Sequence, residues 1–555
     1  MGSAGLQLDE ARGQLHFTHE GIEASGIGGR LLGSQVYVDL SDNDGGFEMH
    51  LRGTVSSDSL ARRYFFPLMP FVNGRTDYQV DFMFPKLTEN LYADISFYSD
   101  LQGITVSLPP PLLKSSALPR ELTLRSHLQP GKEISLELVY GDIAEARFVL
   151  VANGDELELV RGRIELGGIS SEKGPMDGLG LYARLENIEF DAWRDFFDSL
   201  DSPSESESTG LTLVDVQFGN LVLPAKDMGP FSLRMRRQPG AWEGFMENRF
   251  ASGRFAVKID HGEIAGLDLD LDYLRIPEKG SLENYSSGEG VDWKPQSFPD
   301  LNIRAGRLFW EQTDYGTLEL VTTRQAREMQ IDRLNLFGKG VDLKLVGKWV
   351  DSAGGQRTSV AGRLDIDSLG DFLRNRGKPG LIMDARVRSR VSLTWDDPVY
   401  DLNAENLSGT ARAEFGEGRF LTVDPGGIGR LFGLFNLDGL KNLLLLDFGD
   451  LFGRGLSFED GECAFRVSRG LVKINRLLVN ALPAEIIVAG EVDLVKEQLD
   501  DIVTVMPRAV IAGATILFER LQGNRSREVI NRKYWITGGW DDPDVVRLPG
   551  SRKSL

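Results

Sequence analysis

Apolar and polar residues alternate along much of this chain, as they do in β-strands with one apolar and one solvated face. In one segment leucines alternate with Asp268, Asp270 and Asp272. Strands with one solvated face are typical of antiparallel sheets, whereas parallel sheets are usually buried on both faces. The pattern therefore predicts a mainly β protein with a mostly antiparallel sheet. The clearest apolar positions are Ile134, Leu136, Leu138, Leu267, Leu269, Leu271, Val341, Leu343, Leu345, Val391 and Leu393.

Few segments have helical periodicity. Residues 190–200 and 366–376 each predict a short helix. The strongest signal is an amphipathic helix near 428–446, where apolar residues recur close to helical spacing. A further apolar run, 503–521, is interrupted by Pro507. The apolar residues of the amphipathic helix are Leu431, Phe432, Leu434, Phe435 and Leu437.

Changes in composition divide the chain. We expect a β segment over 1–200, a polar linker over 201–210, a second β segment over 211–400 with a loop at 277–299, and a C-terminal region over 401–555. The sequence Trp-Asp-Asp-Pro occurs at 395–398 and again at 540–543. In each copy the Trp should pack, an Asp should accept hydrogen bonds from backbone amides in a turn, and the Pro should end strand pairing.

Charge restricts the partners. The 555 residues include 62 Lys and Arg against 82 Asp and Glu, which gives a formal net charge of -20. Phosphate backbones and anionic lipid surfaces repel such a chain, so we expect no nucleic-acid partner and only apolar contact with membranes. The hydrophobic fraction of 41% is sufficient for a large buried surface. The single cysteine, Cys463, excludes a disulfide framework and a cysteine-based zinc site.

Candidate catalytic groups are scarce. Of the five histidines only His16 and His19 are close in sequence, and three residues apart on a strand they point to opposite faces. The chain contains no HExxH, Walker A or GxSxG motif. We therefore expect no enzyme activity, no metal and no cofactor. A carbohydrate-active β-solenoid enzyme stays an alternative, because its two carboxylates can come from distant parts of a chain.

Alternation by itself is compatible with two architectures. In a set of β-sandwiches each sheet buries its apolar face against another sheet. In a single long, curved sheet the apolar face lines an open groove. The chain has uneven strand lengths and no repeat of about 100 residues, which a sandwich array would show. Periodicity does not decide between these two architectures.

The region from Gly416 onwards contains the runs Gly416-Glu-Gly-Arg-Phe-Leu-Thr-Val-Asp-Pro-Gly and Leu446-Asp-Phe-Gly-Asp-Leu-Phe-Gly-Arg-Gly-Leu-Ser-Phe458, followed by Gly538-Gly-Trp-Asp-Asp-Pro543. By these runs the region resembles the AsmA-like YhdP family, most specifically in residues 416–458. Upstream, Gly347-Lys-Trp349 and the opening Gly13-Gln-Leu-His-Phe17 are similar to the family's central domain.

The resemblance implies a fold and a role. Family members are anchored in the inner membrane of Gram-negative bacteria, cross the periplasm, and form a long twisted sheet curved into an apolar groove. That groove is thought to carry phospholipid acyl chains towards the outer membrane. By this resemblance the eleven apolar positions above would line the groove. The helix near 428–446 would cap it or contact the inner leaflet of the outer membrane, or an outer-membrane partner.

The chain begins in strand-like sequence, without a signal peptide or an apolar run long enough to span a bilayer. Because the family has an N-terminal membrane helix and is usually longer, we expect this chain to be a portion of a family member. We expect a monomeric, periplasmic lipid-conduit segment. The alternatives are a non-enzymatic envelope scaffold or assembly protein with a filled β core, and the carbohydrate-active enzyme.

Overall fold

The computed structural model describes residues 7–17, 21–43, 46–63, 68–85, 92–129, 133–153, 156–168, 178–199, 210–223, 226–276, 294–310, 313–375, 382–399, 401–421, 456–481, 484–507, 532–539 and 543–549. The described residues form 34 strands and a few short helices. The chain divides into two compact units, Met1–Arg254 and Phe255–Leu555, and β18 (Ala251–Asp260) contains the boundary. The expected mainly β fold is confirmed. The domain boundaries expected from composition stay a prediction.

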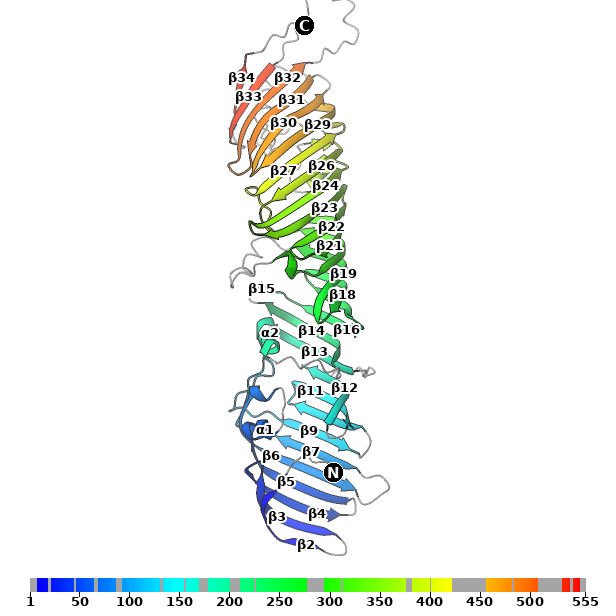
Figure 1. Cartoon of the computed structure of the whole chain (residues 1–555), viewed down its shortest axis with the longest axis vertical. Helices are drawn as coiled ribbons and strands as arrows, with labels where there is room; N and C mark the ends of the chain where they lie inside the picture. The colour runs from blue at the N-terminus through cyan, green and yellow to red at the C-terminus, as the bar shows by residue number, and fades with distance from the viewer. Residues whose placement is uncertain are drawn as a thin grey trace, which may run out of the picture. The chain divides into compact units, whose positions relative to one another are not determined.

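The first unit is a sheet in which most strands pair with the next strand in sequence (Figure 1). Its elements are β1 (Asp9–Arg12), β2 (Leu15–Phe17), β3 (Ile22–Leu31), β4 (Ser34–Asn43), β5 (Gly46–Ser56), α1 (Ser57–Arg63), η1 (Met69–Phe71), β6 (Val72–Pro85), β7 (Ala93–Ser99), β8 (Ile104–Val106), β9 (Leu122–Leu128), β10 (Ile134–Tyr140), β11 (Ala144–Asn153), β12 (Glu156–Leu166), β13 (Gly178–Glu189), α2 (Phe190–Ser199), β14 (Leu211–Leu223), β15 (Lys226–Asp227), β16 (Phe231–Gln238) and β17 (Ala241–Asn248).

The second unit repeats this arrangement with longer strands. Its elements are β19 (Glu263–Ile276), η4 (Pro295–Ser297), β20 (Asp300–Trp310), β21 (Thr313–Arg324), β22 (Glu328–Gly338), β23 (Val341–Ser352), β24 (Gly355–Ile366), α3 (Leu369–Arg374), β25 (Ile382–Asp384), β26 (Val387–Trp395), β27 (Leu407–Phe415), β28 (Gly418–Phe420), β29 (Leu456–Ser468), β30 (Leu471–Ala481), β31 (Ala484–Asp493), β32 (Gln498–Pro507), β33 (Arg532–Gly539) and β34 (Pro543–Leu548).

Pairing is mostly antiparallel, as the alternation predicts. Among the pairings of the described residues, β12–β13, β13–β14 and β19–β20 are parallel. Parallel neighbours need a connection that returns the chain to the same end of the sheet. The stretches of sequence that break the alternation, 201–210 and 277–299, lie between β13 and β14 and between β19 and β20. The sequence therefore marked two of these connections as irregular, but it did not indicate that the strands they join run parallel.

Two predicted helices are confirmed. Residues 190–200 contain α2 and residues 366–376 contain α3, whose N-cap Ser368 side chain accepts a hydrogen bond from the Asp371 amide. Helix α1 was not predicted, because its seven residues carry too little apolar periodicity. The helix predicted near 428–446 lies outside the described residues, and so does the linker expected over 201–210, apart from Gly210. So does most of the apolar run 503–521, of which 503–507 belong to β32.

The first Trp-Asp-Asp-Pro copy does end a strand. Trp395, the last residue of β26, is buried, and its indole Nε1 donates to the Pro398 carbonyl at 2.8 Å. Asp397 accepts a hydrogen bond at 2.5 Å, but from the side chain of Asn406 rather than from a backbone amide. In the second copy only Pro543, the first residue of β34, is described.

The most completely buried core lies in the second unit, on β29–β33. Its members include Val472, Ile474, Val492 and Val503, each at most 4% exposed. One carboxylate lies within this core. Asp501 on β32 is 4% exposed and lies between Gly490 of β31 and Ile536 of β33, and its Oδ1 atom has no hydrogen-bond partner among the described residues.

Burial and, to a lesser extent, the neighbouring charge of Asp500 together raise the pKa of Asp501 to about 7. Between the ordinary carboxyl pKa of 3.8 and about 7, the folded protein holds a proton that the unfolded chain has already released. Unfolding then releases a proton, so the stability of the fold decreases as the pH rises through this window.

Replacing this carboxyl should remove the pH dependence. We expect the free energy of unfolding of the wild type to fall by about 4 kcal/mol, relative to that of Asp501→Asn, between about pH 4 and pH 8. Denaturant unfolding followed by circular dichroism at several pH values measures the difference. Parallel curves for the two proteins across this range would mean that Asp501 keeps an ordinary pKa in the folded state.

Candidate functional site

The second unit has a continuous apolar face, which cross-strand pairing assembles from strand to strand. Directly paired residues on neighbouring strands point to the same face of a sheet. We call this surface the second-unit apolar face. Its central row runs across ten neighbouring pairs of strands and consists of Leu269, Ile303, Leu320, Leu334, Leu345, Gly362, Val391, Ala411, Phe465, Ile474 and Gly490.

Two flanking rows complete this face. One row consists of Leu271, Ala305, Leu318, Leu336, Leu343, Leu364, Ser389, Ala413, Cys463, Leu477, Val488 and Val503. The other consists of Leu267, Leu301, Thr322, Ile331, Gly347, Val360, Leu393, Gly409, Val467, Val472, Val492 and Leu499. Seven of the candidate positions therefore share these rows. Val341, the eighth, lies on the same face at its edge, opposite Ile366.

The first-unit apolar face is built in the same way. One of its rows consists of Val38, Leu51, Val80, Phe97, Leu124, Leu138, Ala146, Ile164, Leu181, Val214 and Met235. A neighbouring row contains Leu136, which is paired with Phe148 and Ser126, and Ile134 pairs with Leu150 on the same face. All three candidates on β10 thus belong to one face.

Exposure differs along the second-unit apolar face. Leu343 and Leu345 on β23 and Val391 and Leu393 on β26 are half-buried, although they are surrounded by other apolar side chains. From β29 onwards a larger share of the same rows is buried, as in Val472 and Val492, although Phe465, Leu477 and Val488 are half-buried. A filled sandwich core would bury both stretches equally. The apolar surface of β19–β27 is therefore more accessible than that of β29–β33.

Part of the first-unit apolar face is covered by helix α2, which the sequence predicted without this role, and by a segment around Leu101 and Ile104 that the sequence did not single out. Trp193 of α2 packs against a cluster that contains Ala183 and Val214, and its Nε1 atom donates to the Pro110 carbonyl at 3.1 Å. A second cluster around Leu101 and Ile104 packs against Leu138. The only signal in the sequence was the concentration of aromatic residues in α2.

Lys114 stabilises the 101–115 segment, which covers part of the first-unit apolar face. This side chain is 3% exposed, and its ammonium donates to the carbonyls of Leu101, Ile104 and Ser115 at 2.7, 2.8 and 3.0 Å. Burial lowers the pKa of Lys114, although these three acceptors suit the charged form. We interpret Lys114 as a structural cation that holds the 101–115 segment together.

The opposite face of the second unit is polar. Lys344, Arg363, Arg390 and Arg412 occupy paired positions on β23, β24, β26 and β27. Glu319 and Asn335 are paired on β21 and β22, where the Asn335 amide donates to the Glu319 carboxylate at 3.2 Å. Each strand therefore presents one apolar and one charged side, which is the condition that a sheet needs in order to keep a large apolar surface in water without precipitating.

Catalytic arrangements are not found among the described residues. No group of three or more His, Cys, Asp or Glu side chains in this part of the chain could hold a metal ion. His50 and His127 are each hydrogen-bonded to one aspartate, at 2.6 and 2.7 Å, the first at a half-buried position and the second at an exposed one. Burial raises the pKa of the Cys463 thiol to about 11, so at neutral pH this sulfur is a poor nucleophile.

The membrane-contact candidates Leu431, Phe432, Leu434, Phe435 and Leu437 lie outside the described residues, and their role stays a prediction. Among the helices that the structure does describe, none has the length and apolar character needed to cross a bilayer.

Comparison with known proteins gives a family. The model of the YhdP protein family matches residues 1–545. A curated relative, the intermembrane phospholipid transporter YhdP of Escherichia coli (strain K12), is 26% identical over 281 residues, which are 47% of this chain and 22% of the relative. The matched part is thus about a fifth of that relative's length. No solved structure matches the chain. The match over nearly the whole sequence establishes that the chain belongs to the YhdP family.

Proposed function

We propose that this chain is a segment of an intermembrane phospholipid transport protein, and that its apolar faces carry acyl chains. The observation that supports this proposal best is the central row of half-buried apolar positions, which continues from strand to strand on β19–β26. The relative is named as an intermembrane phospholipid transporter, and this name supports phospholipid as the cargo. Transport by a protein of this kind is not an enzymatic reaction.

Acyl chains suit this surface energetically. Each methylene group that leaves water gains about 0.8 kcal/mol, so a few half-buried leucines can hold a chain without a deep pocket. The rows are chemically uniform, because Leu, Val, Ile, Ala and Gly supply nearly all of their members. A lipid could therefore move along the rows without passing a strongly preferred site.

Glycines on the apolar face support a groove that bends around the cargo. A Cβ atom at Gly362 would overlap the Lys344 carbonyl oxygen, and one at Gly490 would overlap the Asp500 carbonyl oxygen. Both glycines belong to the central row. Glycines at such positions let a sheet curve, because the backbones of neighbouring strands approach each other on that side. We propose that the apolar face is the concave one.

The second candidate function is an envelope scaffold with a filled β core. The buried cluster on β29–β33 favours it for that part of the second unit. We therefore place the lipid-carrying surface of this unit on β19–β27 and assign β29–β33 a structural role. In the cell we place the chain in the periplasm, attached through the full-length protein to the inner membrane. We propose that its C-terminal end faces the inner leaflet of the outer membrane or a partner there, and that the chain is a monomer.

Phospholipid should accompany the purified chain. We expect mass spectrometry of protein isolated in mild detergent from a Gram-negative host to detect bound phospholipid in at least an equimolar amount. A soluble β protein of similar charge, purified from the same cells, controls for adventitious lipid. A scaffold with a filled core would carry no more lipid than this control.

A charge on the apolar face should prevent lipid contact. We expect Leu343→Glu to lower crosslinking to a phospholipid with a photoreactive acyl chain by about fivefold or more, because a carboxylate is costly to bring next to an acyl chain. Val346→Glu is the matched control, since Val346 lies on β23 as well, is 53% exposed and points to the opposite face.

Circular dichroism of both variants verifies that the sheet remains folded. Equal crosslinking by the two folded variants would show that Leu343 does not contact the lipid, and that the apolar face of β23 is not part of its path.

A further inference from the structure

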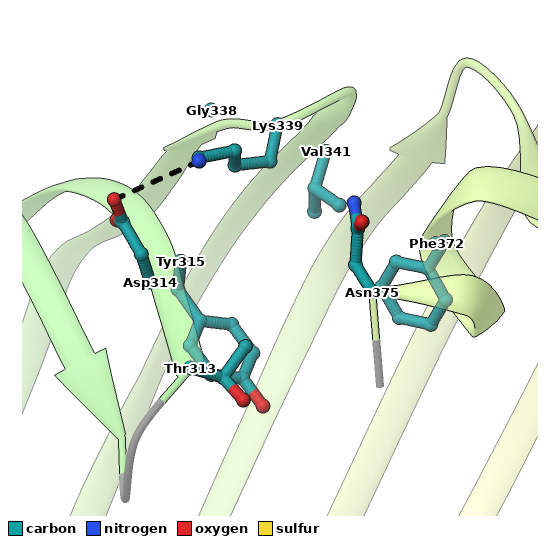
Figure 2. Close-up of a pocket in the computed structure, with 8 residues that line it drawn as sticks. All are labelled: Thr313, Asp314, Tyr315, Gly338, Lys339, Val341, Phe372 and Asn375. Atoms are coloured by element: carbon teal, nitrogen blue, oxygen red, sulfur yellow. Dashed lines mark ion pairs between the residues drawn. The ribbon is translucent and has the colours of Figure 1, made fainter. Parts of the chain in front are cut away.

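A small pocket opens at one edge of the second-unit apolar face. It has a volume of about 250 Å³ and lies where the start of β21, the turn between β22 and β23, and helix α3 meet (Figure 2). Figure 2 shows the charged side chains of Asp314 and Lys339 on one side, and Val341, Phe372 and the amide of Asn375 on the other. The lining residues are Thr313, Asp314, Tyr315, Gly338, Lys339, Val341, Phe372 and Asn375.

The apolar side of the pocket continues into the proposed lipid surface. Val341 pairs with Ile366 of β24, which in turn pairs with Val387 of β26, so these three side chains form the edge row of the second-unit apolar face. Phe372 reaches the pocket from α3. An acyl chain lying on β23 and β24 would therefore end beside this pocket.

The charged side of the pocket has more cations than anions. Asp314 accepts from the Gly316 amide at 2.9 Å and from the Arg307 guanidinium at 3.1 Å. Burial alone would raise its pKa, but these two donors and the charge of Lys339 together hold the pKa of the carboxyl below its ordinary value. Asp314 is thus ionised at neutral pH, and it balances only one of the two cations.

Lys339 has bonding capacity left for a ligand. Its Nζ atom lies 3.8 Å from Asp314 Oδ2, which is beyond hydrogen-bond length, and its side chain is 60% exposed. A lysine ammonium carries three donors. Because Arg307 already neutralises Asp314 through a direct hydrogen bond, an anion that approaches Lys339 would meet a net positive site.

The backbone holds Lys339 in an uncommon conformation. Lys339 has a φ of 53° and Gly340 a φ of 76°, and they form the two-residue turn between β22 and β23. Such turns need positive φ at both positions, and Asn, Asp or Gly usually occupies the first. A lysine at the first position makes the turn less stable than Asn, Asp or Gly would, but it places the ammonium at the edge of the apolar face.

We propose that this pocket binds the phosphate of a phospholipid whose acyl chains lie on the second-unit apolar face. The inference rests on the proposed function and adds a headgroup site to it. Lys339 pairs with the phosphate, Arg307 keeps Asp314 from repelling it, and Val341 and Phe372 contact the first methylene groups of the acyl chains. A free inorganic phosphate would leave this apolar half of the pocket without a ligand, so the arrangement favours the lipid.

The test compares two soluble short-chain lipids that differ only in the headgroup. Dihexanoyl phosphatidylglycerol and dihexanoylglycerol are titrated into the whole chain by calorimetry, below the concentration at which they aggregate, and inorganic phosphate is titrated separately. We expect the phospholipid to bind about tenfold more tightly than the diacylglycerol, because a charge-assisted hydrogen bond is added. We expect no measurable binding of inorganic phosphate.

Lys339→Asn removes the charge and keeps a residue that this turn accepts. It should lower phospholipid affinity about tenfold, to that of the diacylglycerol, and leave diacylglycerol affinity unchanged. Lys348→Gln is the control, because Lys348 lies on the polar face of β23, where it pairs with Glu328 at 3.5 Å. It should change neither affinity. Thermal unfolding verifies that both variants are folded.

Several outcomes would overturn the headgroup site. They are equal affinities of the wild type for the two lipids, an unchanged preference in Lys339→Asn, an equal loss in Lys348→Gln, and displacement of the phospholipid by inorganic phosphate. In each case diacylglycerol binding would still support the proposed function. If neither lipid binds the wild type, the apolar face carries no acyl chains, and the proposed function fails together with this inference.

Discussion

The structure depends on cross-strand register. In a strand, successive side chains point to opposite faces, so a shift of one residue between neighbours would bring every aspartate and arginine of one strand onto the apolar side. The pairing keeps Leu334, Leu345 and Val391 on one side and Lys344 and Arg390 on the other. Each added strand must satisfy the same condition. The two apolar faces are therefore properties of the pairing rather than of any single segment.

Residues that the register places in the same row differ in how deeply they are buried. Leu345 and Ile474 occupy the same row, yet Leu345 is half-buried and Ile474 is 2% exposed. The first kind of surface can contact a mobile apolar ligand, whereas the second is already packed. Asp501, within the packed stretch, shows the cost of this packing, since its carboxyl has a pKa of about 7 instead of 3.8.

The rows of the apolar faces are almost entirely aliphatic, and the other kinds of side chain lie around them. Helix α2 and the segment held by Lys114 cover part of the first-unit apolar face. In the second unit, Lys339 and Asp314 form a charged border beside Val341. A lipid has one apolar and one charged end, so a surface that recognises it needs both kinds of residue next to each other. The proposed headgroup site has this arrangement.

The sequence by itself determined the strands and their two-sided character. The alternation at 267–271 and 341–345 specified which side chains share a face within a strand, because that property depends only on the local backbone. It did not specify the parallel pairs, the cover of the first-unit apolar face or the burial of β29–β33. It also gave no sign that Asp314 and Lys339 meet, because they lie on different strands. These features depend on contacts between residues far apart in the chain, and only the tertiary structure decides them.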